Sequence, residues 1–407
     1  MKDVTNTIPR GSRRLGFGSI VVVAAHEYAG NFVSGRYLVD SASTHAALST
    51  PLCDLLGIRH PLIQAPMAGG WTTPELVSAV SNAGGFGVLA GARVSPDKLR
   101  EDIRAVRALT NQPFGVNFLL APPEPGNRDV ASVQRFLDRF REELGLPPGE
   151  TDLSLPPSPL EDQLGVVFEE RVPVLSTGLG DPGELVGRAH AEDMLVVSMV
   201  STVAEAVRVV EGGADIVVAQ GAEAGGHRST FELGAGGEVP LVGTLALVPQ
   251  VVDAVNVPVV AAGGISDGRG LVAALALGAA AAQLGTRFLL ARESGAHPAY
   301  RERLLAATEE DTVVTRLFTG RPARGLRNRY VEECLSAGAE PLAWPLQSVA
   351  AGDIYDTSRA TDNDDHSPLL AGQGLRMLKE NGQGAAEIVE EIVAEAGAVL
   401  SRLGNSG

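Results

Sequence analysis

Cysteine is scarce in this chain of 407 residues, which contains only Cys53 and Cys334. The two lie far apart and form no CxxC pair, so the sequence excludes a disulfide framework and a metal site built from several thiolates. We expect both thiols to be buried and structural. Such sparing use of cysteine is typical of a reducing compartment, and we therefore predict a cytoplasmic protein.

Positive charge and long apolar runs are also in short supply. Lysine and arginine total 33 against 49 aspartate and glutamate residues, which gives a formal net charge of -16. Nucleic acid is bound by stripes of lysine and arginine, so this balance argues against such a partner. No apolar run approaches the roughly 18 residues that cross a bilayer, and we predict no contact with a membrane.

Residues 1–50 precede the regular pattern of the rest of the chain. Arginines stand before a short apolar stretch, Arg13 to Ala25, as they do in a signal peptide, but glycines interrupt the stretch and no cleavage motif follows it. We therefore interpret residues 1–50 as an N-terminal extension, either a flexible segment or the product of a misplaced start, rather than as a secretion signal.

Aromatic residues make up only 4% of the chain, and small apolar residues dominate instead, which suits tightly packed layers of strands and helices. From Pro61 onward, short apolar runs alternate with segments of helical period, such as Thr73 to Ala83 and Ser95 to Leu109, each opening on a helix-capping residue. The predicted strands are PLIQAP from Pro61, FGVLA from Phe86, FGVNFLL from Phe114, VPVLSTG from Val172, LVVSMV from Leu195, IVVAQG from Ile216, VPVVAAGG from Val257 and AAQLGT from Ala281.

Eight βα units within about 230 residues predict an α/β fold, a closed (β/α)8 TIM barrel, over residues 51–290. The strands are apolar throughout, as expected when helices cover a parallel sheet. An open doubly wound sheet gives the same alternation and is the alternative. Residues 121–160 are a predicted insertion after strand three, in the position of a lid. Residues 291–407 are a predicted helical C-terminal region whose last helix packs on the barrel or forms a homodimer surface.

Glycine-rich turns follow three consecutive predicted strands. AEAGGH after strand six contains Gly225 and Gly226, AAGGISDGRG after strand seven contains Gly263 and Gly264, and QLGTRF ends strand eight. Loops after strands seven and eight of a barrel commonly bind phosphate through backbone N–H groups. An acidic chain can therefore hold an anionic cofactor locally. A GxGxxG motif after the first strand is absent, so a Rossmann dinucleotide site is not supported.

Polar side chains also occur where the predicted strands end. Asn117, Gln220 and Gln283 stand at the ends of strands three, six and eight, and a buried amide must find hydrogen-bond partners. Three such amides suit a heteroaromatic ring with several donors and acceptors. Met67 in QAPMAGG is suited to lie against a flat ring, although a methionine that fills a gap in the core fits the pattern equally well.

His227 is the one histidine of seven that follows a glycine turn at a predicted strand end. Its ordinary pKa of about 6.5 allows proton transfer near neutrality, and we predict that it is a catalytic base. The segment TDNDDHS, Thr361 to Ser367, has the residue types of a metal site, but consecutive acidic residues in a loop are usually a solvated turn, and we predict no metal.

Five ordered motifs resemble the nitronate monooxygenase family, formerly called 2-nitropropane dioxygenases, and its relative the FMN-dependent enoyl-acyl-carrier-protein reductase. They are PLIQAPMAGGWTTPELVSAVSNAGGFG, AQGAEAGGHR, AAGGISDGRG, QLGTRFLLARES and FTGRPARGLRNR. The resemblance implies a barrel with an added small domain that binds FMN. It implies His227 as the active-site histidine, and a phosphate site near Gly264 and the strand-eight turn. The FMN contacts that it implies are Ala65, Pro66, Met67, Asn117, Gln220, Gly225, Gly226, Gly263, Gly264, Gln283, Leu284, Gly285 and Thr286.

The resemblance leads to an expected reaction and two alternatives. In the expected reaction, His227 deprotonates a small nitroalkane or binds its nitronate, and FMN and O2 convert it to a carbonyl compound and nitrite. The alternatives are an NAD(P)H-dependent enoyl-thioester reductase and a flavin-binding protein without catalysis. LSTGLGDP from Leu175 is closer to the reductases, and Trp344 and Arg359 replace a tyrosine and a lysine of one monooxygenase branch. Trp71 either lines the substrate pocket or packs in the core.

Overall fold

The computed structural model describes residues 48–404 except 93, 125 and 156. Apart from residues 48–50, the predicted N-terminal extension lies outside the described residues. None of the described helices combines the length and the apolar character that a membrane crossing requires.

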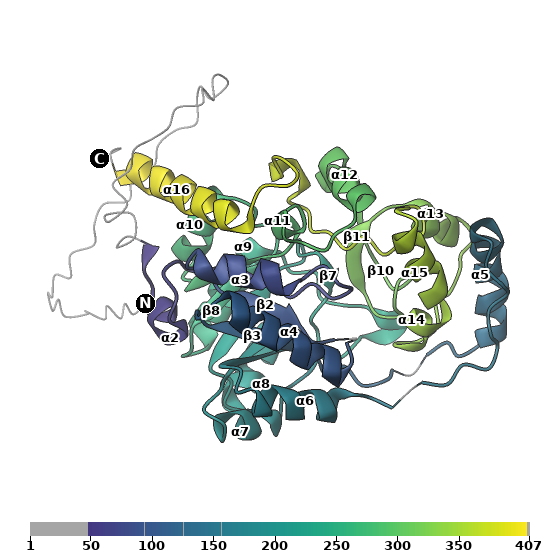
Figure 1. Ribbon diagram of the computed structural model, residues 1–407, viewed down its shortest axis with the longest axis horizontal. Helices are drawn as coiled ribbons and strands as arrows, with labels where there is room; N and C mark the ends of the chain where they lie inside the picture. Colours follow the sequence, from purple (N-terminus) through teal and green to yellow (C-terminus); the bar gives the residue numbers. More distant parts are fainter. Residues whose placement is uncertain (1–47, 93, 125, 156, 405–407) are drawn as a thin grey trace, which may run out of the picture. The chain divides into compact units, whose positions relative to one another are not determined.

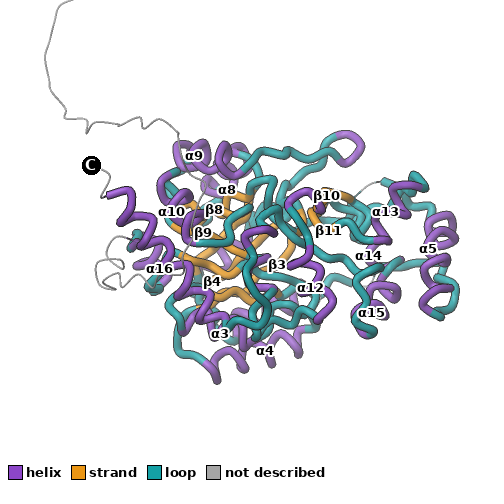
Figure 2. The backbone as a smooth tube through the Cα atoms, turned by 90° about the horizontal axis from the view of Figure 1, so that it is seen from above, coloured by secondary structure: helices purple, strands orange, loops and turns teal. Residues whose placement is uncertain are grey.

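Eight parallel strands form the barrel, in the order β1-β9-β8-β6-β5-β4-β3-β2. A bridge between Ile63 and Phe86 brings β1 back to β2 and closes the ring. Figures 1 and 2 show strands of this sheet with helices around them. Each strand coincides with a predicted run, so the barrel prediction is confirmed. The strands are β1 (Leu62–Gln64), β2 (Gly87–Ala90), β3 (Phe114–Leu119), β4 (Val174–Gly178), β5 (Leu195–Val200), β6 (Ile216–Gln220), β8 (Val259–Ala262) and β9 (Ala281–Leu284).

Helices surround this sheet. The predicted caps form: the side chains of Thr73, Ser95 and Thr202 each accept a hydrogen bond from a backbone N–H in the first turn that follows. The barrel helices between the strands are α3 (Pro74–Asn82), α4 (Pro96–Leu109), α6 (Leu160–Glu169), α7 (Leu185–His190), α8 (Val203–Glu211), α9 (Thr244–Ala254) and α10 (Gly268–Ala276).

A short helix closes the end of the barrel opposite the carboxyl ends of the strands. In α2 (Pro51–Leu56), Leu52 and Leu56 share one core with side chains that point into the barrel, among them Phe86 and Val218. Thr50 donates a hydrogen bond from Oγ1 to the carbonyl of Ala280, 2.7 Å away. Because apolar side chains fill this end, a ligand enters the barrel from the other end.

The last helix, α16 (Ala385–Gly404), takes the place of the eighth barrel helix. Its Ile388 and Ile392 belong to the same buried cluster as Leu76 of α3 and Leu271 of α10. Figure 1 shows α16 lying across α10. The chain therefore leaves the barrel after β9 and returns to complete it about a hundred residues later, as repeated βα units require.

The segment between β9 and α16 forms a smaller folded unit, which we call the excursion (residues 286–384). The sequence analysis expects it to be helical, but it also contains two antiparallel strands, β10 (Thr312–Thr315) and β11 (Ala323–Leu326). Only four residues long and interrupted by Arg324, β11 lacks a clear apolar pattern. The helices of the excursion are α11 (Thr286–Leu289), α12 (Pro298–Ala306), α13 (Arg329–Ser336), α14 (Leu346–Ala350) and α15 (Gly352–Ala360), with 3-10 turns η2 (Glu309–Asp311) and η3 (Leu375–Met377).

The predicted insertion after strand three is part of the core of this unit. Its helix α5 (Val130–Leu144) buries Leu137 and Phe140 in one cluster with Phe318 and Tyr330 of the excursion. Arg141 of α5 also donates from Nε to Asp353 of α15, 2.7 Å away. The insertion thus packs as a structural element of this unit, and its position as a lid stays a prediction.

We predict that close approach of α16 to α10 depends on Gly268. A Cβ atom at this position would lie 2.3 Å from the backbone nitrogen of Ala396. Gly268→Ala should therefore lower the free energy of unfolding by about 1–3 kcal/mol, the usual cost of overpacking. Urea denaturation followed by circular dichroism measures this change.

Gly165→Ala is the matched control, because Gly165 is inside α6 and a Cβ atom there would meet nothing within 4 Å. Alanine has the higher helix propensity, so this variant should gain about 0.5–1 kcal/mol. Equal stability of the two variants would contradict the assignment of α16 as a tightly packed barrel helix.

Candidate active site

The open end of the barrel carries one layer of inward-facing side chains. In strands, successive side chains point to opposite faces, and Val218 of β6 and Ala281 of β9 belong to the barrel interior. Gln220 and Gln283 therefore also face inward, and both pair with Ala262 of β8 in the sheet register. Asn117 of β3 occupies the same layer on the other side of the ring.

Two of these amides have capacity for a ligand. Asn117, 6% exposed, donates from its side chain to Ser176 Oγ, 2.9 Å away. Gln283 is equally buried, yet within the described part of the chain no residue hydrogen-bonds to its side chain. The amide atoms of Gln283 are still accessible to solvent, so a polar ligand at the open end of the barrel can hydrogen-bond to them.

Gln220 is held by the segment that carries His227. Its Nε2 donates to the carbonyl of His227 at 2.9 Å, and its Oε1 accepts from Arg228 Nη1 at 2.8 Å and from the backbone N–H of Ser229 at 2.9 Å. The predicted role of Gln220 as a cofactor contact stays a prediction. These hydrogen bonds give Gln220 a further role, which is to fix the turn after β6.

His227 lies on a strand that the sequence analysis missed. Strand β7 (Gly226–His227) pairs with β11 of the excursion, with Ala323 opposite His227, and so becomes the third strand of the antiparallel sheet β10-β11-β7. The histidine therefore follows a barrel strand in sequence but is positioned by the smaller unit. A two-residue strand has no periodicity for the sequence to reveal.

The imidazole of His227 has two neighbours from the excursion. Its Nε2 is 2.8 Å from Thr319 Oγ1, and its ring meets that of Trp344 edge to face, with centroids 5.4 Å apart. The two tautomers of a neutral imidazole differ in which ring nitrogen carries the proton, and a hydrogen bond with a hydroxyl group helps to select one of them. Thr319 lies within the motif FTGRPARG, but neither it nor Trp344 has a local sequence signal that marks it as a site residue.

Two different constraints favour glycine in the turn after β6, one of backbone conformation at Gly226 and one of space at Gly225. Gly226 has φ of +81°, a left-handed conformation that favours glycine, and a Cβ atom there would meet nothing within 4 Å. At Gly225 a Cβ atom would lie 2.6 Å from the carbonyl carbon of Ala371. Gly226 thus borders open space, whereas Gly225 admits another segment of the chain.

That segment, residues 371–374, crosses the loops after the last three barrel strands. The N–H of Gly372 donates to Thr286 Oγ1 at 3.0 Å, and the N–H of Gln373 donates to the carbonyl of Glu223 at 2.9 Å. The sequence analysis did not place this AGQG segment at the site. Only the tertiary structure brings it there, from the end of the excursion.

The turns after β8, β9 and β1 adjoin one another. Gly263 and Gly264 both have positive φ, +118° and +69°. The N–H of Ala65 donates to the carbonyl of Leu284 at 2.8 Å, and a Cβ atom on Gly285 would lie 3.9 Å from Met67 Sδ. The predicted contact groups around Ala65–Met67, Gly263–Gly264 and Gln283–Thr286 thus occupy the same end of the barrel.

The N-terminus of α10 is already occupied by a carboxylate. Asp267 accepts hydrogen bonds from the N–H groups of Arg269 and Gly270. Burial by itself raises the pKa of Asp267, but hydrogen bonds from Arg269 and Gly270 outweigh burial and hold that pKa below its usual value. An anion at this end of the barrel would therefore meet Gly264 and the turn at Gly285 rather than α10.

Several other residues singled out in the sequence have structural surroundings. Trp71 is only 9% exposed and packs against Tyr300 and His297, with the Arg359 guanidinium 5.7 Å from its ring centroid, so it packs in the core. Asp362 in TDNDDHS accepts from the N–H of Ala299 at 2.9 Å. Among the described residues, no group of three or more His, Cys, Asp or Glu side chains is arranged to hold a metal.

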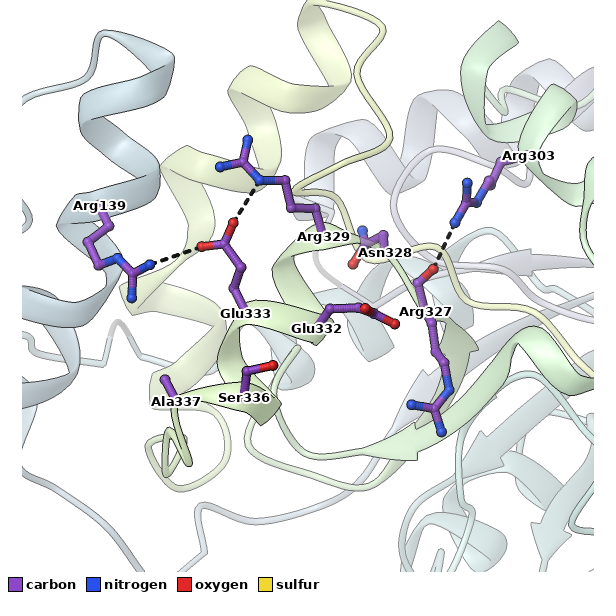
Figure 3. Close-up of a pocket in the computed structure, with 9 residues that line it drawn as sticks. All are labelled: Arg139, Arg303, Arg327, Asn328, Arg329, Glu332, Glu333, Ser336 and Ala337. Carbon is purple, nitrogen blue, oxygen red and sulfur yellow. Dashed lines mark hydrogen bonds and ion pairs between the residues drawn. The ribbon is translucent and has the colours of Figure 1, made fainter.

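A recess of about 800 Å³ lies elsewhere, on the excursion (Figure 3). Arginines surround it, but Arg139 and Arg329 both pair with Glu333, at 3.2 and 2.7 Å. None of the predicted site residues lines it. We therefore place the candidate active site at the open end of the barrel.

The comparisons with known proteins agree with this geometry. The nitronate monooxygenase family model matches residues 49–395. The chain belongs to the nitronate monooxygenase family. A probable nitronate monooxygenase of Staphylococcus saprophyticus is 36% identical over 87% of this chain and 99% of its own length. A similar relative from Staphylococcus haemolyticus is also 36% identical, over 86% of this chain and 98% of that protein.

Two solved structures share the fold at substantial identity. Nitroalkane oxidase from Streptomyces ansochromogenes is 37% identical with a TM-score of 0.80, covering 86% of this chain and 99% of its own. FabK from Thermotoga maritima is 33% identical with a TM-score of 0.71, covering 88% of this chain and 99% of its own. Membership of this family makes the protein an oxidoreductase.

We predict that Gly225→Ala displaces the 371–374 segment, because the added methyl group would overlap the backbone of Ala371. The N–H groups of Gly372 and Gln373 would lose their acceptors and exchange at least tenfold faster with solvent deuterium. Mass spectrometry of peptides spanning this segment measures the exchange.

Gly226→Ala serves as the comparison, since a Cβ atom there meets nothing within 4 Å and only its left-handed backbone is strained. Its exchange over the same segment should stay within twofold of the unmodified protein. Equal exchange in both variants would refute the packing of this segment on Gly225.

Proposed function

We propose that this protein is an FMN-dependent nitronate monooxygenase, which oxidises nitroalkanes or alkyl nitronates with O2 to carbonyl compounds and nitrite. The observation that carries the proposal is the position of His227. It stands on a glycine turn beside the ring of inward-facing amides at the open end of the barrel, in a chain of the nitronate monooxygenase family. The scarcity of cysteine supports a cytoplasmic setting.

The residues at the barrel mouth fit FMN. The side chains of Asn117 and Gln283 would hydrogen-bond the heteroatoms of its ring, and Met67 would lie against the ring face. The backbone at Gly263, Gly264, Gly285 and Thr286 would hold its phosphate. The side-chain amide of Gln283 supports this assignment, because it has no hydrogen-bond partner among the described residues and can bond to a polar ligand. When bound, FMN supplies the electron acceptor and the centre at which O2 reacts.

The chain's own residues bind the substrate and move its proton. A ring nitrogen of His227 accepts the proton from the carbon next to the nitro group, or the ring binds the nitronate when that anion is supplied directly. Thr319 Oγ1 orients the ring through Nε2. Trp344 packs edge to face against the imidazole and helps to hold its orientation.

The first experiment mixes the purified protein, without oxygen, with propionate 3-nitronate and separately with NADH. Loss of the oxidised flavin absorbance with the nitronate alone is the expected result. His227→Ala should retain its flavin and lower oxygen uptake with the neutral nitroalkane, whose proton must first be removed, by roughly a hundredfold, because general acid–base catalysis contributes about 10²–10⁴. Unchanged turnover in this variant would favour a flavin-binding protein without catalysis.

Enoyl-thioester reduction with NAD(P)H is the second candidate. The likeness to FabK, an enoyl-acyl-carrier-protein reductase, and the LSTGLGDP turn support it. Rapid bleaching of the flavin by NADH, with the nitronate inert, would assign the protein to this activity instead.

We predict that Thr319→Val lowers kcat about tenfold with flavin content unchanged. Valine keeps the shape of the side chain and removes the hydroxyl next to His227 Nε2, and loss of a hydrogen bond worth about 1.4 kcal/mol corresponds to a tenfold change in rate. Thr319→Ser restores the hydroxyl and should recover kcat to within threefold. Equal losses in both variants would show that packing, rather than the hydroxyl, matters at this position.

A further inference from the structure

Arg228, which directly follows His227, is completely buried. Its Nη1 donates to Gln220 Oε1 at 2.8 Å and to the carbonyl of Gly221 at 2.7 Å. Its Nη2 donates to the carbonyls of Gln220 and Pro240 at 3.1 and 3.3 Å. All four acceptors are uncharged. The guanidinium Nε is buried without a hydrogen-bond partner among the described residues.

Three other deeply buried arginines of this chain have a carboxylate partner, whereas the buried Arg324 hydrogen-bonds to the carbonyl of Ala222 and to Thr312 Oγ1. Arg141 contacts Asp353 at 2.7 Å, Arg287 contacts Glu391 at 2.9 Å, and Arg321 pairs with Glu124. Within the described residues, no carboxylate oxygen lies within 4.0 Å of Arg228. A buried charge normally requires such a partner, so Arg228, the more deeply buried of the two exceptions, needs a reason.

The nearest acidic side chains are occupied elsewhere. Glu205 accepts from Thr230 Oγ1 at 2.7 Å and from the N–H of Phe231, while Glu223 accepts from the N–H and the hydroxyl of Thr244. Burial lowers the pKa of Arg228 to about 10, helped by the positive charge of Arg324 and opposed by Glu205 and Glu223. The guanidinium is therefore still charged at neutral pH.

This charge determines which way the Gln220 amide faces. The acceptor atom of the amide must receive the hydrogen bonds from Arg228 and from the N–H of Ser229, so it is Oε1. The other atom is then Nε2, which carries two N–H bonds, and one of them goes to the carbonyl of His227. Gln220 faces the barrel interior next to Ala262, in the layer that contains Gln283.

We propose that Arg228 is a positioning residue for an anion-binding point at the barrel mouth. Its guanidinium holds Gln220 with Nε2 as the donor and strengthens that donor toward a planar oxyanion, the class that includes nitronates and carboxylates. Polarisation along a chain of hydrogen bonds provides the mechanism. The inference rests on the proposed function, which places an anionic substrate beside His227, the residue whose carbonyl Gln220 Nε2 binds.

The test uses two inert probes of the same shape, propionate and propionamide, which differ in charge. Their dissociation constants are measured by isothermal titration calorimetry with the full-length protein as purified. The unmodified protein should bind propionate more tightly. Arg228→Met should reduce this preference at least tenfold by weakening propionate, with propionamide unchanged within twofold. Arg228→Lys keeps a positive charge, but one ammonium group cannot replace the two guanidinium nitrogens that bind Gln220. This variant should reduce the preference for propionate at least threefold.

Two further variants separate positioning from general stability. Arg141→Lys replaces another buried arginine, far along the chain in α5, and should lower the urea midpoint while leaving the preference for propionate unchanged. If Arg228 acts through Gln220, the double variant Arg228→Met with Gln220→Leu should lose no more preference than Gln220→Leu alone. Additive losses would overturn the role of Gln220 as intermediary.

Other outcomes decide the inference directly. An unmodified protein that does not distinguish the probes, or an Arg228→Met variant that weakens both equally, would overturn it. If Arg228→Met does not fold, an unchanged preference in Arg228→Lys would overturn it as well. Neither probe can be oxidised as a nitronate is, so the result is independent of turnover. A protein inert toward nitronates that still prefers propionate would refute the proposed function and leave this inference standing.

Discussion

Two backbone pairings, Ala323 opposite His227 and Arg324 opposite Gly226, join the loop after β6 to a sheet of the excursion. The N–H of Arg228 extends this pairing through its hydrogen bond to the carbonyl of Pro322, 2.9 Å away. Since the pairing holds the backbone of the histidine, it also determines what the imidazole meets, namely Thr319 and Trp344. The candidate site therefore exists only when barrel and excursion are folded together.

The path of the chain explains how this is possible. Between β9 and α16 the polypeptide leaves the barrel, builds β10, β11 and the second core, and then returns to supply the eighth helix. The insertion after β3 contributes α5 to the same second core, through Leu137 and Phe140. The insertion after β3 and the excursion between β9 and α16 therefore both connect the smaller unit to the barrel. The segment at 371–374, on the way back to the barrel, lies across the glycine turns.

Charge is distributed unevenly between the whole chain and this site. The protein has a formal charge of -16, yet Arg228, Arg321 and Arg324 are all buried behind the turn that carries His227. Burial lowers the pKa of each of these arginines. An acidic protein can thus present local positive charge to an anion, because buried charges are screened far less than those at the surface.

The sequence by itself determined the barrel, because each of its eight apolar runs and capped helices is a local pattern that can be recognised within a short stretch of residues. It also pointed to the turns that adjoin the mouth, since glycine at a strand end has a local meaning. Only the tertiary structure decided three other features. It makes Gly226–His227 a strand, places the hydroxyl of Thr319 beside the imidazole, and brings residues 371–374 to the site. Each depends on contacts between segments about 90 to 150 residues apart, and no local period encodes such pairings. For Arg228, the sequence determines its place directly after the histidine, whereas its lack of a carboxylate partner among the described residues is a property of the folded chain.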